Sequence, residues 1–256
     1  MSSPSPADGV SARALPPLPD VRPGDDLAAL IAAAAPADLG DGDVLVVAHK
    51  VVSKAEGQVR PLAQIEPGER ARALAAEHGK DPRLVQAVLD ESVELLRAHD
   101  GVFICATHHG FVCANAGVDQ SNVSAEGDLV LLPRDPDGSA RALRARIGAA
   151  RGARPAVVVV DSFGRAWRLG QTDVAIGVAG LVVLDAWSGR PDAYGRDLRV
   201  TSIAIADAAA AAADLARAKD SRQPAVLVRG LERHVTTDDG PGAAALRRPR
   251  DQDLFR

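Results

Sequence analysis

The sequence predicts an α+β fold, in which helices flank a mixed, largely antiparallel sheet. Segments with strand character outnumber long helical segments, and the two kinds do not alternate strictly along the chain. Strict alternation would indicate a doubly wound parallel sheet instead. Aromatic residues make up 3% of the 256 residues and hydrophobic residues 46%, so the core of this fold must be aliphatic.

The N-terminal part of the chain predicts a leader, a helix and a strand. Residues 1–17 are rich in Ser, Pro and Ala, and we expect them to form a disordered leader. A helix is expected from near Leu27, because Asp25 or Asp26 can cap its first turn. The apolar run that follows predicts a strand over residues 44–54.

The middle of the chain predicts a long helical region and a set of shorter elements. Residues 66–98 have helical periodicity, with an apolar stripe that includes Val85 and Val93. Two strands are expected around a turn that contains Gly110. The remaining strands are expected at 128–133, 157–160, 181–187, 197–205 and 225–230, and the remaining helices at 139–150 and 206–218.

Length and composition limit the class of protein. The chain is long enough for a sizeable core, and we expect one domain over residues 18–235 followed by a tail or linker remnant over 236–256. A formal net charge of −4 argues against a general nucleic-acid binder. No run approaches the roughly 20 apolar residues of a membrane span, and no signal-peptide pattern is present. Two cysteines cannot form a disulfide framework. We therefore expect a cytoplasmic protein that binds neither nucleic acid nor membranes.

The first candidate functional segment is the run His49–Lys54. No Walker A sequence and no G-x-G-x-x-G fingerprint is present, so a bound nucleotide would have to be held by other polar groups. Lys50 and Lys54 are two of only four lysines in the chain. An ammonium group just past a buried strand can neutralise a phosphate. The alternative interpretation is a solvated strand end.

The second candidate is the run Asn115–Asn122, which is rich in small and polar residues. Asp119 and Asn122 offer oxygen ligands of the kind that hard cations bind. Asp, Asn and Gly are also common turn formers, so the alternative is a simple turn.

The third candidate follows four consecutive valines. Asp161 stands where the apolar run ends, and a carboxylate there needs a cation, backbone donors or an arginine as partner. Ser162 adds a second oxygen, and Mg²⁺ or Mn²⁺ binds carboxylate, hydroxyl and phosphate oxygens together. The alternative is a structural network of carboxylates and arginines. Further polar residues within reach of this point are Arg165, Arg168, Gln171 and Asp173.

A fourth group has the residue types of a zinc site: Cys105, His108, His109 and Cys113. All four lie within nine residues across a tight turn, unlike the two-knuckle spacing of structural zinc. Buried cysteines, with the histidines in turn or pocket roles, are the favoured interpretation. A Cys-His or Ser-His-Asp hydrolase stays open on composition, although no G-x-S-x-G elbow is present.

Taken in order, several segments resemble the coenzyme F420-0:L-glutamate (γ-glutamyl) ligase family. They cover about residues 15–232 and read LPDVRPGDDL, VLVVAHKVVSKAEG, HHGFVCANAGVDQSN, VVVVDSFGRAWRLGQTDVAIGVAGL, GRDLRVTSIAIAD and AVLVRG. Any one segment alone would be a weak match, whereas the ordered set is specific. The resemblance implies the mixed fold of that family and a homodimer with its active site near the subunit interface.

The resemblance also implies site residues. The residues implied to contact GTP are Leu18, Pro19, Asp20, Val21, His49, Lys54 and Asn122. Those implied to hold divalent cations, Mg²⁺ or Mn²⁺ at two sites, are Asp119, Asp161 and Ser162, and the catalytic set is Asp119, Asp161 and Lys54. Two departures stand out. His49 occupies a position where Ser or Gln is frequent, and Lys219 lies near a position where many relatives place a Glu or Gln ligand of the second metal.

The activity implied by the resemblance is GTP-dependent ligation of L-glutamate to F420-0, through an acyl phosphate, with release of GDP and phosphate. The same chemistry extends to further γ-linked glutamates. Potassium is implied as a helper ion, and a separate nitroreductase-like protein as a partner, because the tail resembles a junction that leads into such a domain in some relatives. The alternatives are a metal-dependent nucleotide-binding module and a phosphohydrolase, both without ligase activity.

Overall fold

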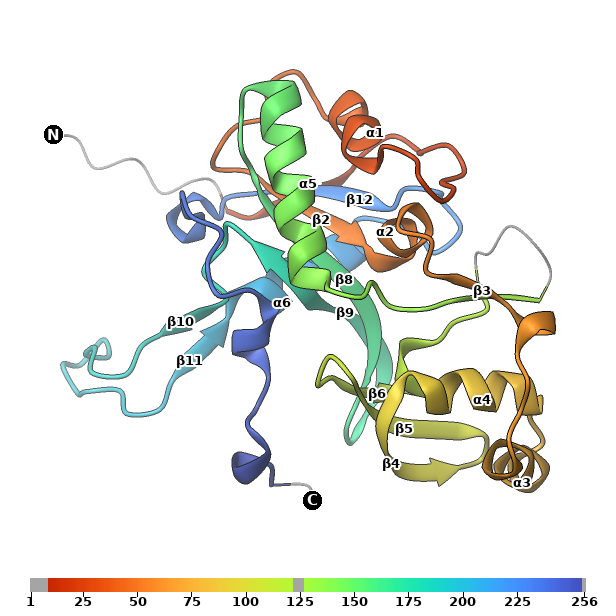
Figure 1. Cartoon of the computed structure of the whole chain (residues 1–256). Coiled ribbons are helices and arrows are strands. Elements are labelled where there is room, and N and C mark those ends of the chain that lie inside the picture. Colours follow the sequence, from red (N-terminus) through yellow and green to blue (C-terminus); the bar gives the residue numbers. More distant parts are fainter. Residues whose placement is uncertain (1–8, 122–126, 255–256) are drawn as a thin grey trace, which may run out of the picture.

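A five-stranded sheet forms the centre of the molecule (Figure 1). The computed structural model describes residues 9–121 and 127–254. The strand order is β1-β12-β2-β8-β9. The bounds of these strands are Ser11–Ala14 for β1, Val44–Ala48 for β2, Ala156–Arg165 for β8, Arg168–Ala179 for β9 and Ala225–Arg229 for β12.

Only one neighbouring pair in this sheet is parallel, which confirms the predicted α+β fold with a mixed, largely antiparallel sheet. Strand β2 pairs with β8 in parallel, with Val47 opposite Val159 and Ala48 opposite Val160. The pairs β1–β12, β12–β2 and β8–β9 are antiparallel. Because β2 and β8 run in the same direction, their carboxyl ends meet at one edge of the sheet.

Helices cover both faces of the central sheet. The helices are α1 (Leu27–Ala34), α2 (His49–Ala55), α3 (Glu69–His78), α4 (Pro82–Asp90), α5 (Pro136–Arg151) and α6 (Ile205–Leu215). Successive side chains of a strand point to opposite faces, so Val157 and Val159 pack in one cluster with α1 and α5. Val158 and Val160 pack in a second cluster with the alanines of α6. The four-valine run is therefore buried on both faces, as its composition predicts.

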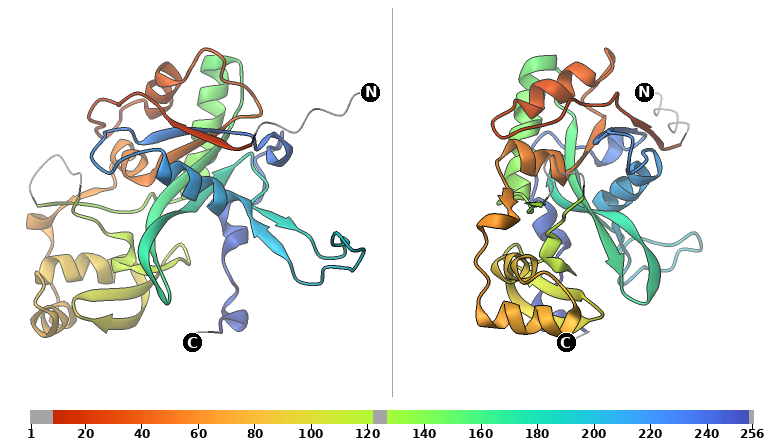
Figure 2. Two further views of the ribbon diagram at one scale, coloured as in Figure 1. Left: turned by 180° about the vertical axis from the view of Figure 1, so that it is seen from behind. Right: turned by 90° about the vertical axis from the view of Figure 1, so that its right-hand side faces the viewer.

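A smaller unit lies beside the carboxyl edge of the sheet (Figures 1 and 2). It consists of α3, α4 and a three-stranded antiparallel sheet, with a core of its own around Phe103 and Leu129. An arm made of two strands projects from the other side of the central sheet. The strands outside the central sheet are β3 (Val59–Pro61), β4 (Ser92–His99), β5 (Val102–Thr107), β6 (Val112–Ala114), β7 (Asp128–Val130), β10 (Leu184–Ala186) and β11 (Ser202–Ala204).

Most predicted elements are present, with shifted ends. Asp26 caps α1 by accepting a hydrogen bond from the Ala29 amide, and the turn at Gly110 joins β5 to β6. The predictions at 128–133, 181–187, 197–205 and 225–230 correspond to β7, β10, β11 and β12, and those at 139–150 and 206–218 to α5 and α6.

Two predicted elements are correct in type over only part of their length. The strand expected over 44–54 ends at Ala48, and residues His49–Ala55 form α2, because His49, Val52 and Ser53 are buried with helical spacing. The helix expected over 66–98 is broken at Gly79 and ends at Asp90, after which β4 begins. The predicted apolar stripe holds within α4, where Val85 is buried, and does not extend to Val93, which is 63% exposed.

The two terminal segments differ from expectation as well. Within the expected leader, residues Ser11–Ala14 pair with β12 and Leu15 is buried, so order begins well before residue 18. Residues 1–8 lie outside the described part. Within the expected tail, Ala243 is buried in the core on the α6 side of the sheet, and its amide donates to the Asp137 carboxylate in α5. Tail residues 236–246 are therefore packed on the domain.

Candidate active site at the carboxyl edge of the parallel strand pair

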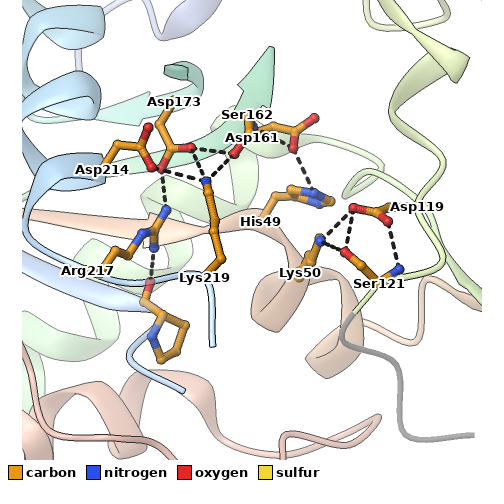
Figure 3. A network of polar contacts seen from close by, with 11 residues as sticks. His49, Lys50, Asp119, Ser121, Asp161, Ser162, Asp173, Asp214, Arg217 and Lys219 are labelled. Carbon is orange, nitrogen blue, oxygen red and sulfur yellow. Dashed lines mark hydrogen bonds and ion pairs between the residues drawn. The ribbon is translucent and has the colours of Figure 1, made fainter. Parts of the chain in front are cut away.

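Polar side chains gather where β2 ends beside β8, which continues to Arg165 (Figure 3). Strand β2 leads directly into α2, whose first turn supplies His49 and Lys50. Strand β8 supplies Asp161 and Ser162. The predicted clusters at 49–54 and at 161–162 are thus brought together by the parallel pairing of the two strands.

His49 lies directly beside Asp161. The imidazole is buried, and its Nε2 lies 3.2 Å from Asp161 Oδ1. Its Nδ1 lies 3.4 Å from Ser53 Oγ, one turn further along α2. Nε2 has no hydrogen-bond partner of good geometry among the described residues, so the Asp161 carboxylate is the group it faces. In this geometry His49 packs against the carboxylate, and its contact with a nucleotide stays a prediction.

Asp119 meets Lys50 on the other side of His49 (Figure 3). Lys50 Nζ lies 2.6 Å from Asp119 Oδ2 and donates a hydrogen bond of 2.6 Å to Ser121 Oγ. The Ser121 amide donates to Asp119 Oδ1 at 2.7 Å. Burial raises the pKa of Asp119, but the hydrogen bonds from Lys50 and from the Ser121 backbone outweigh it, so the pKa lies below its ordinary value.

The predicted first metal site contains two carboxylates and a lysine. Figure 3 shows the carboxylates of Asp119 and Asp161 in one region, separated by His49 and Lys50. Two carboxylates offer the oxygen ligands that Mg²⁺ and Mn²⁺ bind, and water or phosphate oxygens usually complete such a shell. Among the described residues, no group of three or more His, Cys, Asp or Glu side chains could hold a metal ion by itself. Because Lys50 and Ser121 contact the two oxygens of Asp119, a metal ion at Asp119 and Asp161 stays a prediction.

Ser162 belongs to a different cluster from Asp161. Because neighbouring residues in a strand point to opposite faces, Ser162 faces α6. Its hydroxyl donates to Asp173 Oδ1 at 2.6 Å and accepts from Lys219 Nζ at 2.8 Å. Asp173, opposite Ser162 in β9, is 1% exposed and binds Arg217 through its second oxygen.

Two residues of the cluster around Ser162 and Asp173 were not predicted from the sequence. Asp214 and Arg217 come from the C-terminal end of α6 and the residues that follow it. The available signal was the change from an alanine run to the charged segment DLARAKD. That segment alone reads as an exposed helix end, and only the position of β9 makes it part of the site.

The predicted nucleotide segment at 18–21 lies beside α2. Lys54 Nζ is 3.4 Å from Asp20 Oδ1, while Leu18 and Val21 are buried in the core. The structure therefore brings together Asp20 and Lys54, which the resemblance places at GTP. Asn122 lies outside the described residues.

The remaining residues of the polar run after Asp161 are divided between two places. Asp173 is buried, but Arg165, Trp167, Arg168 and Gln171 are exposed at the end of the β8–β9 hairpin. Arg165 donates to the Leu169 carbonyl oxygen within the same turn. A role for these arginines in binding a carboxylate substrate stays a prediction.

The zinc interpretation finds no support in the geometry. His108 and His109 contact the carbonyl oxygens of Asp90 and Pro133. Cys105 and Cys113 are buried free cysteines. Burial, and then the charge of Asp161 and the neighbouring Cys105, raise the pKa of Cys113 to about 12. A thiol that keeps its proton is a poor nucleophile, which argues against a Cys-His hydrolase at Cys113.

Comparison with known proteins shows which family this chain resembles. A family model described as F420-0:Gamma-glutamyl ligase matches residues 17–230. A coenzyme F420:L-glutamate ligase of Methanothermobacter thermautotrophicus is 44% identical over 252 residues, which cover 97% of this chain and 99% of that protein. The protein of the same name from Archaeoglobus fulgidus is 47% identical over 215 residues, covering 84% of this chain and 85% of its own.

Within residues 9–121 and 127–254, no helix has both the length and the apolar character that crossing a membrane requires.

Proposed function

The chain belongs to the F420-0:gamma-glutamyl ligase family and is a ligase, and on that premise we propose that it joins L-glutamate to F420-0 in coenzyme F420 biosynthesis, using GTP. The observation that carries the proposal is the meeting of the matched segments at one edge of the sheet. Asp161, His49 and Lys50 lie there together with Asp119, and Lys54 lies in the next turn of α2.

The proposed reaction has two steps. A carboxylate oxygen of F420-0 attacks the γ-phosphorus of GTP, the bond from that phosphorus to the β,γ-bridging oxygen breaks, and GDP leaves. The free amine of glutamate then attacks the carbonyl carbon of the acyl phosphate. Phosphate leaves with the bonding electrons, and the nitrogen gives up its extra proton to water. The products are the amide, GDP and phosphate.

The protein's part in these steps is to position the reactants and neutralise charge, which phosphoryl transfer mainly requires. Lys54 has its ammonium group beside Asp20, where it can bind phosphate oxygens. Asp119 and Asp161 would hold a divalent cation, which when bound supplies further positive charge at the phosphates. His49 keeps the Asp161 carboxylate in place.

The test is to mix purified protein with F420-0, GTP, Mn²⁺ and L-glutamate and to follow products by mass spectrometry. We expect F420-0 to gain one glutamyl unit for each GDP released. Absence of this product, with all four components present and the protein folded, would contradict the proposal. GTP binding without any GDP release would instead favour a nucleotide-binding module, and phosphate release that needs no glutamate would favour a phosphohydrolase.

We further propose that the protein is a homodimer and that K⁺ assists the reaction. The arm that carries β10 and β11 projects from the domain, and Tyr194 and Val200 on it are 91% and 93% exposed. These two exposed side chains on a projecting arm support a contact with a second copy of the chain. Light scattering coupled to size-exclusion chromatography distinguishes a dimer from a monomer, and replacing K⁺ by Na⁺ in the assay tests the helper ion.

A further inference from the structure

The ammonium group of Lys219 is held by three oxygen atoms at the end of β8 (Figure 3). Nζ lies 2.8 Å from Ser162 Oγ, 3.1 Å from Asp214 Oδ1 and 3.5 Å from Asp173 Oδ1. These oxygens come from β8, β9 and α6, which are distant in sequence. A hydroxyl and two carboxylates that converge from separate elements form the kind of donor set that hard cations bind.

Lys219 is not needed to neutralise the buried carboxylate of this cluster. Asp173 is 1% exposed and already has a charged partner, since Arg217 binds its Oδ2 atom. The side chain of Arg217 is 9% exposed, and it also donates to the Pro224 carbonyl oxygen at 2.9 Å. Asp173 and Arg217 thus form a buried pair on their own. Lys219 adds a second positive charge beside Asp214, and its side chain is 65% exposed.

The residues around Ser162 do not fit the second divalent cation that the family resemblance implies. Three of the oxygens that would bind such an ion already hold the Lys219 ammonium group. A metal ion and an ammonium group in the same position would repel one another strongly. A neutral Gln or an acidic Glu near this position would leave the oxygens free, whereas a lysine fills the space between them.

We propose that Lys219 is a built-in cation, which takes the place of a metal ion in the Ser162–Asp173–Asp214 cluster. Its relation to phosphate rests on the proposed function, because Ser162 directly follows Asp161 in β8 and the exposed ammonium group can reach a ligand bound there. A lysine supplies its positive charge at any concentration of free metal. The chain consequently binds one divalent cation fewer than its oxygen donors could hold.

The test counts bound Mn²⁺ in the full-length protein, with Mn²⁺ alone as the probe and no nucleotide or substrate present. Free Mn²⁺ is measured by electron paramagnetic resonance over ~0.1–1 mM, the range in which oxygen-donor sites of moderate affinity fill. We expect Lys219→Gln to bind one Mn²⁺ more per chain than the wild-type protein. Lys219→Arg keeps the positive charge and should gain none. Lys80→Gln, which changes an exposed lysine between α3 and α4, should equal wild type.

A second variant shows where the additional ion binds. Adding Asp214→Asn to Lys219→Gln removes one of the oxygen donors, so the additional Mn²⁺ should be lost again. If Lys219→Gln binds no more Mn²⁺ than wild type while its thermal unfolding is unchanged, the proposal is overturned. Because the count needs neither GTP nor F420-0, its result is independent of whether the ligase reaction is found.

Discussion

His49 illustrates how one buried side chain decides the geometry of the site. Its Nε2 lies 3.2 Å from Asp161 Oδ1 and its Nδ1 lies 3.4 Å from Ser53 Oγ, so the ring is packed directly against the carboxylate. We expect His49→Gln to weaken Mn²⁺ binding at the Asp119–Asp161 pair by about 10–100-fold, as loss of a residue that orients a metal ligand typically does. A Mn²⁺ titration measures this. His99→Gln, at a 71% exposed side chain, is the control, and equal affinity in both variants would refute the role of His49.

We expect Lys54 to contribute to phosphate binding and little to the free energy of unfolding. Its contact with Asp20 is 3.4 Å long and Asp20 is half exposed, so the pair contributes about 0–1 kcal/mol to folding. We expect Lys54→Gln to keep the unfolding temperature of wild type and to lower kcat/KM for GTP by about 100-fold or more, the usual cost of removing a charge clamp. Steady-state kinetics beside a melting curve measure both quantities, and a variant with wild-type kcat/KM would remove Lys54 from the catalytic set.

Asp207 gives the folded state a dependence on pH. Burial raises its pKa, although its Oδ1 accepts a hydrogen bond of 2.9 Å from the Ala175 amide. Between the ordinary pKa and the raised one, the folded protein binds more protons than the unfolded chain, so stability falls as pH rises through this window. Asp207→Asn keeps the acceptor and removes the charge. We therefore measure the free energy of unfolding of Asp207→Asn and of wild type with urea. The variant's value minus the wild-type value should be larger at pH 7 than at pH 4. Asp220→Asn, at an exposed position, is the control, and an equal difference at both pH values would contradict this account.

At the residue scale, the sequence indicated the chemistry but not the partners. Polar residues after apolar runs predicted Asp161 and Lys50 at the end of the core, and a run of small and polar residues predicted Asp119. The separation of Ser162 from Asp161 could also have been predicted, had the strand been extended past Val160, because side chains alternate along a strand. The pairing of Asp173 with Arg217 could not, since it depends on how α6 packs on β9.

At the element scale, the predicted ends of elements were wrong where a strand pattern and a helix pattern both fit the same residues. The run VLVVAHKVVSKA is apolar enough for a long strand, but burial of His49, Val52 and Ser53 follows a helical spacing. In the same way, helical spacing continues through Val93, although the chain turns at Glu91 and pairs with β5 as β4. Local patterns predicted that these elements exist, and tertiary contacts decided where each one ends.

The contact between β9 and α5 makes a prediction about Gly177. A Cβ atom there would lie 2.1 Å from the Pro136 carbonyl oxygen in the first turn of α5, so the helix or the strand would have to move. We expect Gly177→Ala to lower the free energy of unfolding by about 1–3 kcal/mol or more, the usual cost of overpacking. Gly164→Ala in β8 is the matched control, because nothing lies within 4 Å of its Cβ position. Chemical denaturation of both variants is the measurement, and equal stabilities would show that the two elements are less tightly packed than described.

At the scale of the whole molecule, the fold places distant segments around one edge. The parallel pair β2–β8 aligns two polar strand ends, the smaller unit brings Asp119 to Lys50, and the end of α6 brings Lys219 to Ser162. Such long-range juxtaposition is what a single sequence cannot specify through local patterns. That these segments form one site could be predicted here only from the ordered resemblance to a family.

Long-range contacts also hold the C-terminal segment, which its composition alone predicted to be a linker. Arg144 of α5 is 1% exposed, and its guanidinium donates to the Asp238 carbonyl oxygen at 2.8 Å and to Asp239 Oδ1 at 2.7 Å. Removing one partner of a buried charged pair costs about 3–5 kcal/mol, and Asp239 keeps a second partner in Arg154.

For Arg144→Met we therefore expect the free energy of unfolding to fall by ~3 kcal/mol, together with faster amide hydrogen exchange over residues 236–246. Arg141→Met, at a 41% exposed side chain of the same helix, should leave both unchanged. If exchange in that segment stays slow in Arg144→Met, the segment is held by the Asp137 contacts with Ala243 rather than by the buried arginine.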